Sequence, residues 1–246
     1  MADNSHGNNN EDILVSALNQ KSFNNLNKNL KKFISCIDPS INNDDIIYAE
    51  KLGGQKKSDI QLKVKNKKYN ISVKMGQANS VHQEKIEDFI TFLKENYNIS
   101  DDLSDSLRFF IWGDGTLDGT APLKDRMSVS TLKKKHPELI EKINLLLSNH
   151  KNELIDRFIF VGRHDDSIDY IYHGNDIKGS WASKKEIFPY LLNSTNKRAV
   201  ISVGILTFQA WNRSLKGTTD EKRGEIQLKC GQLGSILDTI MNERTF

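Results

Sequence analysis

Asp59 and Lys74 are the side chains in this sequence whose types and spacing best suit chemistry. A carboxylate beside an ammonium group, approached by Gly53 and Gly54, can hold a divalent metal ion next to a phosphate. A phosphodiester repels a hydroxide nucleophile, whereas a divalent metal ion neutralises that charge and lowers the pKa of the attacking water. The pair therefore predicts a metal-dependent nuclease in which Asp59 binds the metal and Lys74 orients or activates the water.

Mg²⁺ is the expected cofactor, because it prefers oxygen ligands, keeps several waters and needs only one or two carboxylates. Ser72 stands where a second acid is expected, and a neutral hydroxyl is a weaker metal ligand than a carboxylate. Glu11, at the start of a predicted helix, is our first choice for the missing carboxylate. The rival acids are Glu50, Glu84 and Glu87. We thus expect metal ligands at Asp59 and Glu11 and a catalytic group completed by Ser72 and Lys74.

A β-hairpin is the element that must position this group. Residues 58–64 and 70–75 each alternate apolar and polar side chains, which is typical of half-buried strands. The segment 65–68 between them has no apolar residue and contains an Asn, which tolerates a tight turn. Pairing Lys65 with Lys68 places Asp59 opposite Lys74, and Gln61 opposite Ser72, on one face of the hairpin.

The rest of the chain predicts an α/β fold, with a mixed central sheet flanked by helices. Apolar side chains at helical spacing predict one or two helices in 13–34 and further helices over 81–97, 137–154 and 233–241. Strands are expected over 46–49, 107–112, 158–161, 168–172, 199–208 and 225–230. The stretch 107–112 is apolar apart from Arg108, and we expect it to form a buried central strand. We find no linker or repeat and expect a single domain over residues 1–246.

Two polar segments are candidates for contact with DNA. The first comprises Gln77, Asn79, Ser80, His82 and Gln83, since Asn and Gln can hydrogen-bond adenine through two bonds. The same segment also fits an ordinary helix cap, with Ser80 as N-cap and Gln83 at the capping-box position. The second segment is basic and follows Trp211; its candidates are Arg213, Lys216, Lys222, Arg223, Gln227 and Lys229. In the strand 225–230, Gln227 and Lys229 project to one face while Ile226 and Leu228 pack on the other.

The composition is that of a globular chain, with 246 residues, 37% hydrophobic and 27% charged. No stretch approaches the roughly 18 apolar residues of a membrane span, and the polar start of the chain is not a secretory signal. Two cysteines do not make a disulfide framework, so a reducing cytoplasm is the expected compartment. The net charge of +3 is weak evidence for a polyanionic partner.

Ser58-Asp59-Ile60 followed by Val73-Lys74 resembles the motif of the PD-(D/E)XK nuclease superfamily. More narrowly, the chain resembles small type II restriction endonucleases that cut short palindromes, some of which replace the middle acid with an amide. Ser72 departs even from that variant. Asn10-Glu11 before a helix also matches, as does the late pair of segments 203–209 and 226–229, which in similar enzymes lies close to DNA. The resemblance does not extend to the middle third of the chain.

This resemblance implies a restriction-endonuclease-like domain that hydrolyses double-stranded DNA at a short sequence with Mg²⁺. It also implies a restriction system with a cognate DNA methyltransferase as genetic partner, no membrane partner, and a monomer or homodimer. One alternative is a repair or junction nuclease of the same fold that recognises DNA structure. Another is a DNA-binding protein that has lost catalysis, which Ser72 makes conceivable.

Each feature also has a purely structural explanation. An Asp facing a Lys across a hairpin is most often a solvated ion pair, and a basic run is most often a solvated face. Residues 113–119 lack the ligand pattern of a calcium-binding loop and predict a turn. His164 and His173 flank a predicted strand, but the residues between them contain no HNH-type motif.

Overall fold

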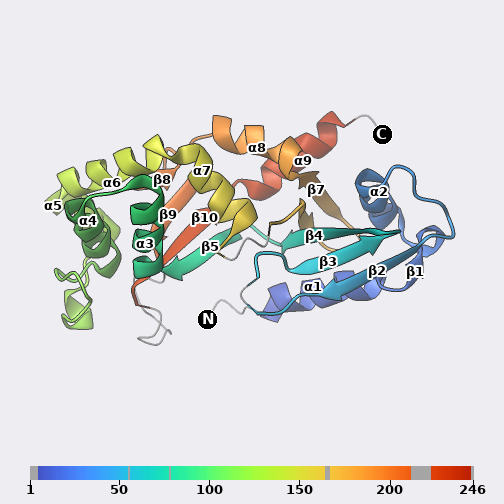
Figure 1. Cartoon of the computed structure of the whole chain (residues 1–246), viewed down its shortest axis with the longest axis horizontal. Helices are drawn as coiled ribbons and strands as arrows, with labels where there is room; N and C mark the ends of the chain where they lie inside the picture. The colour runs from blue at the N-terminus through green and yellow to red at the C-terminus, as the bar shows by residue number, and fades with distance from the viewer. Residues whose placement is uncertain (1–4, 55, 78, 164–166, 212–222, 245–246) are drawn as a thin grey trace. The chain divides into compact units, whose positions relative to one another are not determined.

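The computed structural model describes residues 5–54, 56–77, 79–163, 167–211 and 223–244. Runs of strands and runs of helices follow one another along the chain (Figure 1), and the mixed α/β class predicted from the sequence is confirmed. The chain divides into two compact units, one formed by Met1–Asn79, Ile159–Leu191 and Gly231–Phe246, the other by Ser80–Phe158 and Leu192–Cys230. The single domain expected over 1–246 stays a prediction.

The first unit is built on a six-stranded sheet with the order β1-β2-β3-β4-β6-β7. Its strands are β1 (Lys21–Ser22), β2 (Ile46–Lys51), β3 (Ile60–Val64), β4 (Lys67–Lys74), β6 (Tyr170–Gly174) and β7 (Gly179–Ser183). Only β4 and β6 pair in parallel, so the sheet is mixed. Its helices are α1 (Ser5–Leu18), α2 (Lys28–Ile37), α8 (Lys184–Asn193) and α9 (Leu233–Glu243), with a 3-10 helix η1 (Phe23–Asn25).

One face of this sheet forms the core of the first unit. The alternating residues Ile60, Leu62 and Val64 are almost fully buried, together with Ile71 and Val73 of β4. They pack against apolar side chains of α1 and α2 in one cluster. Because successive residues of a strand point to opposite faces, the residues between them, including Ser72 and Lys74, point to the opposite face.

The second unit has a four-stranded sheet with the order β5-β10-β9-β8. Its strands are β5 (Asn79–Lys85), β8 (Ser202–Val203), β9 (Leu206–Ala210) and β10 (Glu225–Cys230). Its helices are α3 (Ile86–Tyr97), α4 (Asp101–Trp112), α5 (Val129–Lys135), α6 (Pro137–Asn149) and α7 (Lys151–Asp156), with a 3-10 helix η2 (Leu123–Asp125). In the described parts of the chain, no helix is long and apolar enough to cross a membrane.

The predicted hairpin is present, but its register differs from the expected one. Val64 pairs with Lys67 and Ile60 with Ile71, so the turn consists of Lys65 and Asn66. Lys65 adopts the left-handed conformation, with φ of 53°. Both registers keep every side chain on the same face, so apolar alternation could not distinguish them.

Two predicted strands are wrong. Residues 107–112 belong to helix α4, where Ser100 Oγ accepts a hydrogen bond from the backbone N–H of Leu103 at 3.2 Å and Gly113 ends the helix with φ of 65°. Residues 158–161 lie in a π-helix, η3 (Arg157–Val161). Both stretches are short, apolar and largely buried, and periodicity alone does not separate a buried strand from a buried helical segment of this length.

The helix predicted over 81–97 is half right. Residues up to Lys85 form strand β5, and α3 begins only at Ile86. The backbone N–H of Ile86 donates to the carbonyl of Gly224 at 2.8 Å. Ser80 is therefore not an N-cap, although Gln83 Nε2 does lie 3.2 Å from its hydroxyl.

Candidate functional site

The carboxylate of Asp59 gathers the residues predicted as an active site in the first unit. Its Oδ2 accepts hydrogen bonds from Ser72 Oγ at 3.0 Å, from the backbone N–H of Val73 at 2.6 Å and from Lys74 Nζ at 2.9 Å. Among the described residues, these contacts all fall on Oδ2 and Oδ1 accepts no hydrogen bond, so Oδ1 is open to a ligand. The structure thus brings Asp59, Ser72 and Lys74 together, despite the shifted register.

The backbone on both sides holds Asp59 in place. Its N–H donates to the carbonyl of Ile71 at 3.0 Å, and its carbonyl accepts from the N–H of Leu52 at 2.9 Å. Lys74 Nζ also lies 3.0 Å from the carbonyl oxygen of Val73. The side chains of Lys74 and Asp59 are 20% and 22% exposed, so solvent reaches a pair whose geometry is otherwise fixed.

Glu11 of α1 lies within electrostatic reach of this group. Burial raises the pKa of its carboxyl, and the negative charge of Asp59 raises it further, while Lys51 and Lys74 act in the opposite direction. Lys51 Nζ lies 3.3 Å from Glu11 Oε2. A carboxyl group whose proton affinity is raised by a neighbouring carboxylate experiences a repulsion that a bound cation would relieve.

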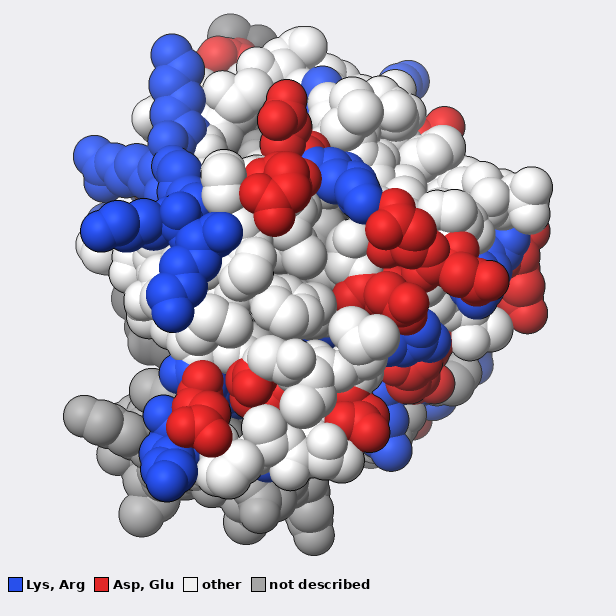
Figure 2. All heavy atoms as spheres, turned by 90° about the vertical axis from the view of Figure 1, so that its left-hand side faces the viewer, with Lys and Arg blue, Asp and Glu red and all other residues white. Residues whose placement is uncertain are grey.

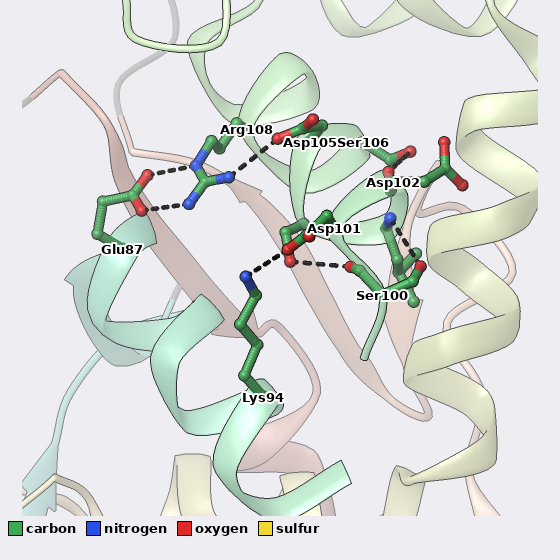
Figure 3. A network of polar contacts seen from close by, with 10 residues as sticks. Glu87, Lys94, Ser100, Asp101, Asp102, Asp105, Ser106 and Arg108 are labelled. Atoms are coloured by element: carbon green, nitrogen blue, oxygen red, sulfur yellow. Dashed lines mark hydrogen bonds and ion pairs between the residues drawn. The ribbon is translucent and has the colours of Figure 1, made fainter. Parts of the chain in front are cut away.

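The rival acids are placed differently. Glu84 is buried in the second unit against His82 and Arg157. Glu87 accepts two hydrogen bonds from Arg108, at 2.8 and 2.7 Å, within the polar network of α3 and α4 (Figure 3). Glu50 is exposed on β2, opposite Gln61. Asp59 contributes to the raised pKa of Glu11, whereas Glu84 and Glu87 form ion pairs within the second unit.

His173 is a further residue of this region; the sequence analysis considered it only for an HNH-type site and did not connect it to Lys74. It pairs with Lys74 in the parallel register of β4 and β6. Its Nε2 lies 2.8 Å from the carbonyl oxygen of Gly76, which also accepts a hydrogen bond from Asn79 Nδ2 at 3.2 Å. The signal in the sequence was a histidine within a strand, and only the strand order could connect it to Lys74.

Some residues of the first set of predicted DNA contacts are exposed in the structure and others are buried. Gln77 and Gln83 are exposed, whereas Asn79 is 5% exposed. His82 is also buried, with its ring tilted by 49° against that of Phe158 and the ring centroids 5.0 Å apart. Gln77 and Gln83 are therefore accessible to a ligand, while His82 belongs to the core of its unit.

The residues of the second set also differ in exposure. Gln227 is 5% exposed and hydrogen-bonds Gln209 and Ser80, whereas Lys229 on the same face is half-buried. Arg223 is held by an ion pair of 3.0 Å with the buried Asp114. Arg213, Lys216 and Lys222 lie outside the described residues.

Surface charge on the second unit is mixed. Figure 2 shows lysine and arginine side chains gathered to one side of a band of acids. Helix α5 ends in the exposed Lys133, Lys134 and Lys135, where cations also stabilise the carbonyl end of a helix. This surface alone does not identify a nucleic-acid partner.

The groups near Asp59 that could bind a metal ion offer oxygen atoms: the carboxylates of Asp59 and Glu11 and the hydroxyl of Ser72. This set suits Mg²⁺, which keeps several of its own waters. Among the described residues, no group of three or more His, Cys, Asp or Glu side chains is placed to hold a metal ion. Any metal here would therefore rely on Asp59 and Glu11.

Comparison with models of protein families and with curated proteins gives no match to this chain.

Proposed function

We propose that this chain is a Mg²⁺-dependent endonuclease that hydrolyses double-stranded DNA at a short specific sequence. The observation that most directly supports this proposal is the contact of 2.9 Å between Asp59 Oδ2 and Lys74 Nζ. The carboxyl of Glu11 is close enough for its pKa to respond to the charge of Asp59. The resemblance of this segment to the PD-(D/E)XK nucleases supports the same reading.

Each residue has a role that its contacts allow. Asp59 and Glu11 would hold the metal, Asp59 through its unengaged Oδ1. Bound Mg²⁺ would supply charge neutralisation at the phosphate and a water of lowered pKa. Lys74 has three N–H donors; one lies on Asp59 and another faces the carbonyl of Val73, so the third can orient a water or a phosphate oxygen. Ser72 holds the Asp59 carboxylate by its hydroxyl.

A restriction system, with a methyltransferase that protects host sites, is the biological setting that follows from sequence-specific cleavage. The amides on the strands of the second unit support recognition of bases. Structure-specific cleavage and binding without cleavage are the competing outcomes of the test below.

The test is digestion of plasmid DNA by the full chain with Mg²⁺, using Asp59→Asn and Lys74→Ala. Wild type should give discrete fragments; Asp59→Asn should abolish cleavage while binding persists. Lys74→Ala should lower the rate by about 10²- to 10⁴-fold, as is typical of a group that assists proton transfer.

Asp45→Asn is the matched control. It weakens another ion pair of the same hairpin, between Lys65 and Asp45 at 3.6 Å, at the turn end of the strands. This variant should cut like wild type. Nicks confined to branched DNA would indicate a structure-specific nuclease. Binding without any cleavage would leave a DNA-binding protein, and cleavage by Asp59→Asn above a tenth of the wild-type rate would overturn the site.

A further inference from the structure

The four-stranded sheet of the second unit has one face covered by helices and one polar face. The ring of Phe208 on β9 lies 5.8 Å from that of Phe89 on α3 and 6.1 Å from that of Phe110 on α4. Side chains alternate along a strand, so Gln209 on β9 points away from these helices. Gln227 is its direct partner on β10 and shares the polar face.

A row of hydrogen bonds fixes these amides. Gln209 Nε2 donates to Gln227 Oε1 at 2.9 Å, and Gln227 Nε2 donates to Ser80 Oγ at 3.2 Å. Ser80 Oγ accepts a further bond from Gln83 Nε2 at 3.2 Å. Both polar atoms of Gln227 are thus engaged, and only 5% of this residue is exposed. Gln227 is therefore placed to orient Gln209, and its own side chain is too buried to contact a ligand.

Gln209 is half-buried and has hydrogen-bonding capacity left over. Its bond to Gln227 uses one of two N–H groups and neither lone pair of Oε1. Among the described residues, its side chain makes no other hydrogen bond. If both amides of the pair are turned over, Gln209 still keeps a donor and an acceptor. The side chain therefore presents a donor next to an acceptor, and its hydrogen bond to Gln227 restricts the rotation of the amide.

Adenine is the base that matches this arrangement in the major groove. It offers the N7 acceptor beside the N6 donor, whereas guanine offers two acceptors. Gln209 and Gln227 lie on β9 and β10, the two inner strands of the four-stranded sheet, and the polar face of this sheet is the surface that would meet the base edges of the major groove. Lys229, two residues after Gln227 on the same face, adds a cation suited to guanine or phosphate.

We propose that Gln209 reads an adenine in the major groove of the DNA substrate, and that Gln227 and Ser80 are positioning residues for its amide. This inference rests on the proposed function and names part of the sequence that the enzyme recognises. The sequence suggested that Gln227 contacts a base; this proposal assigns that role to Gln209, its partner on the neighbouring strand.

The test selects duplexes from a random library by binding to the full chain without divalent metal, and then sequences the bound DNA. Wild type should enrich an adenine at one position of its site. Gln209→Ala should lose that preference while binding random duplexes as before. In competition between duplexes with adenine and with 7-deazaadenine at this position, wild type should discriminate about 5- to 100-fold, and Gln209→Ala should not.

Two more variants sharpen the result. Gln209→Glu removes the donor and keeps an acceptor, so its preference should move toward cytosine, whose N4 donates. Asn96→Ala is the control, because it removes an exposed amide from helix α3, on the helical side of the unit. It should select the wild-type sequence.

Selection of a site without adenine, or an unchanged preference in Gln209→Ala, would overturn the inference. The proposed function is tested separately by cleavage with Mg²⁺ of the selected duplexes. Specific binding that depends on Gln209, without cleavage, would overturn the proposed nuclease activity and support base recognition by Gln209. Specific cleavage that does not depend on Gln209 would support the nuclease activity and overturn base recognition by Gln209. Failure to select any sequence would also overturn base recognition by Gln209.

Discussion

His173 Nε2 donates a hydrogen bond of 2.8 Å to the carbonyl oxygen of Gly76, two residues after Lys74. The bond ties strand β6 to the turn that leaves β4, and Asn79 Nδ2 reaches the same oxygen. Gly76 has a φ of 78°, a conformation that glycine adopts readily. The exit of the chain from Lys74 is therefore fixed from the side of the neighbouring strand.

We predict that His173→Ala lowers the rate of DNA cleavage by about 10- to 100-fold, because small displacements of a reacting group are costly. His173 is a positioning residue in this account, so Mg²⁺ affinity should change little. His173→Gln should restore most of the rate, since its amide can donate to Gly76 from a similar place. Single-turnover cleavage and calorimetric Mg²⁺ binding measure the two effects. Equal losses in both variants would contradict the role of this hydrogen bond.

Glu11 predicts a dependence of stability on pH and on metal. Burial and the charge of Asp59 raise its pKa above 4.5. Such a group binds protons more readily in the folded than in the unfolded chain, so stability falls as pH rises from about 4.5 through the folded-state pKa. Glu11→Gln should therefore be more stable than wild type at pH 7 without metal, with the difference vanishing toward pH 4. Thermal unfolding between pH 4 and 7 measures it.

Mg²⁺ should act in the opposite direction on the same pair. It should raise the melting temperature of wild type at pH 7, because a ligand that binds the folded state stabilises it, and should raise that of Glu11→Gln much less. Asp12→Asn is the control, since Asp12 shares Lys51 with Glu11 but is mostly exposed. The assignment of Glu11 fails if both variants respond to Mg²⁺ as wild type does.

Ser72 should matter less than Asp59. Its hydroxyl donates to Asp59 Oδ2 at 3.0 Å and is buried, yet Val73 N–H and Lys74 Nζ hold the same oxygen. Losing one of three such bonds costs about 1 kcal/mol, so we expect Ser72→Ala to cut roughly fivefold more slowly. A loss comparable with that of Asp59→Asn, in the same cleavage assay, would show that the hydroxyl is itself a ligand or a reacting group.

The sequence predicted the parts of this structure that local pattern determines. Alternation placed Ile60, Leu62 and Val64 in the core, and their burial agrees; it placed Ser72 and Lys74 on the other face, where Ser72 is also buried and Lys74 is half-buried. It could not choose between registers that preserve this alternation. The contact of Asp59 with Lys74 survived the error because Lys74 reaches back past Ser72, its neighbour toward the turn.

Features that depend on tertiary contacts were not predictable in the same way. Phe158 and Phe160 are fully buried in a π-helix, and nothing in an apolar run states which backbone it adopts. The interior location of His82 and the row from Gln209 through Gln227 to Ser80 require strand order. Glu11 was chosen for its place before a helix, and only its coupling to Asp59 separates it from Glu50, Glu84 and Glu87.

The buried ion pair of Glu84 and Arg157 should be the most stability-critical charge pair of the second unit. Arg157 Nη1 lies 2.5 Å from Glu84 Oε1, and Nη2 lies 2.8 Å from Oε2. The Glu84 side chain is fully buried, and the guanidinium also lies 4.1 Å from the centre of the Phe92 ring. Removing Arg157 leaves the buried Glu84 carboxylate to His82 alone among the partners described here, and breaking a buried ion pair costs about 3–5 kcal/mol.

We therefore predict that Arg157→Met lowers the free energy of unfolding by about that amount, measured by urea denaturation at pH 7. Arg157→Lys should rescue little, because a lysine lacks the planar fork that meets both carboxylate oxygens. Arg108→Met is the control: it breaks the bidentate but exposed pair with Glu87 and should cost less than about 1 kcal/mol.

The pH dependence of this loss gives an independent check. Burial alone would raise the pKa of Glu84, but hydrogen bonds from His82 and Arg157 outweigh it and lower the pKa. The stability that the pair contributes is thus present above the unfolded-state pKa of 4.5 and is lost as pH falls through the lower folded-state pKa. The gap in stability between wild type and Arg157→Met should narrow as the pH falls below 4.5 and the Glu84 carboxylate of wild type becomes protonated. A gap that stays constant down to pH 3 would mean that lost packing of the arginine on Phe92, and not charge, causes the destabilisation.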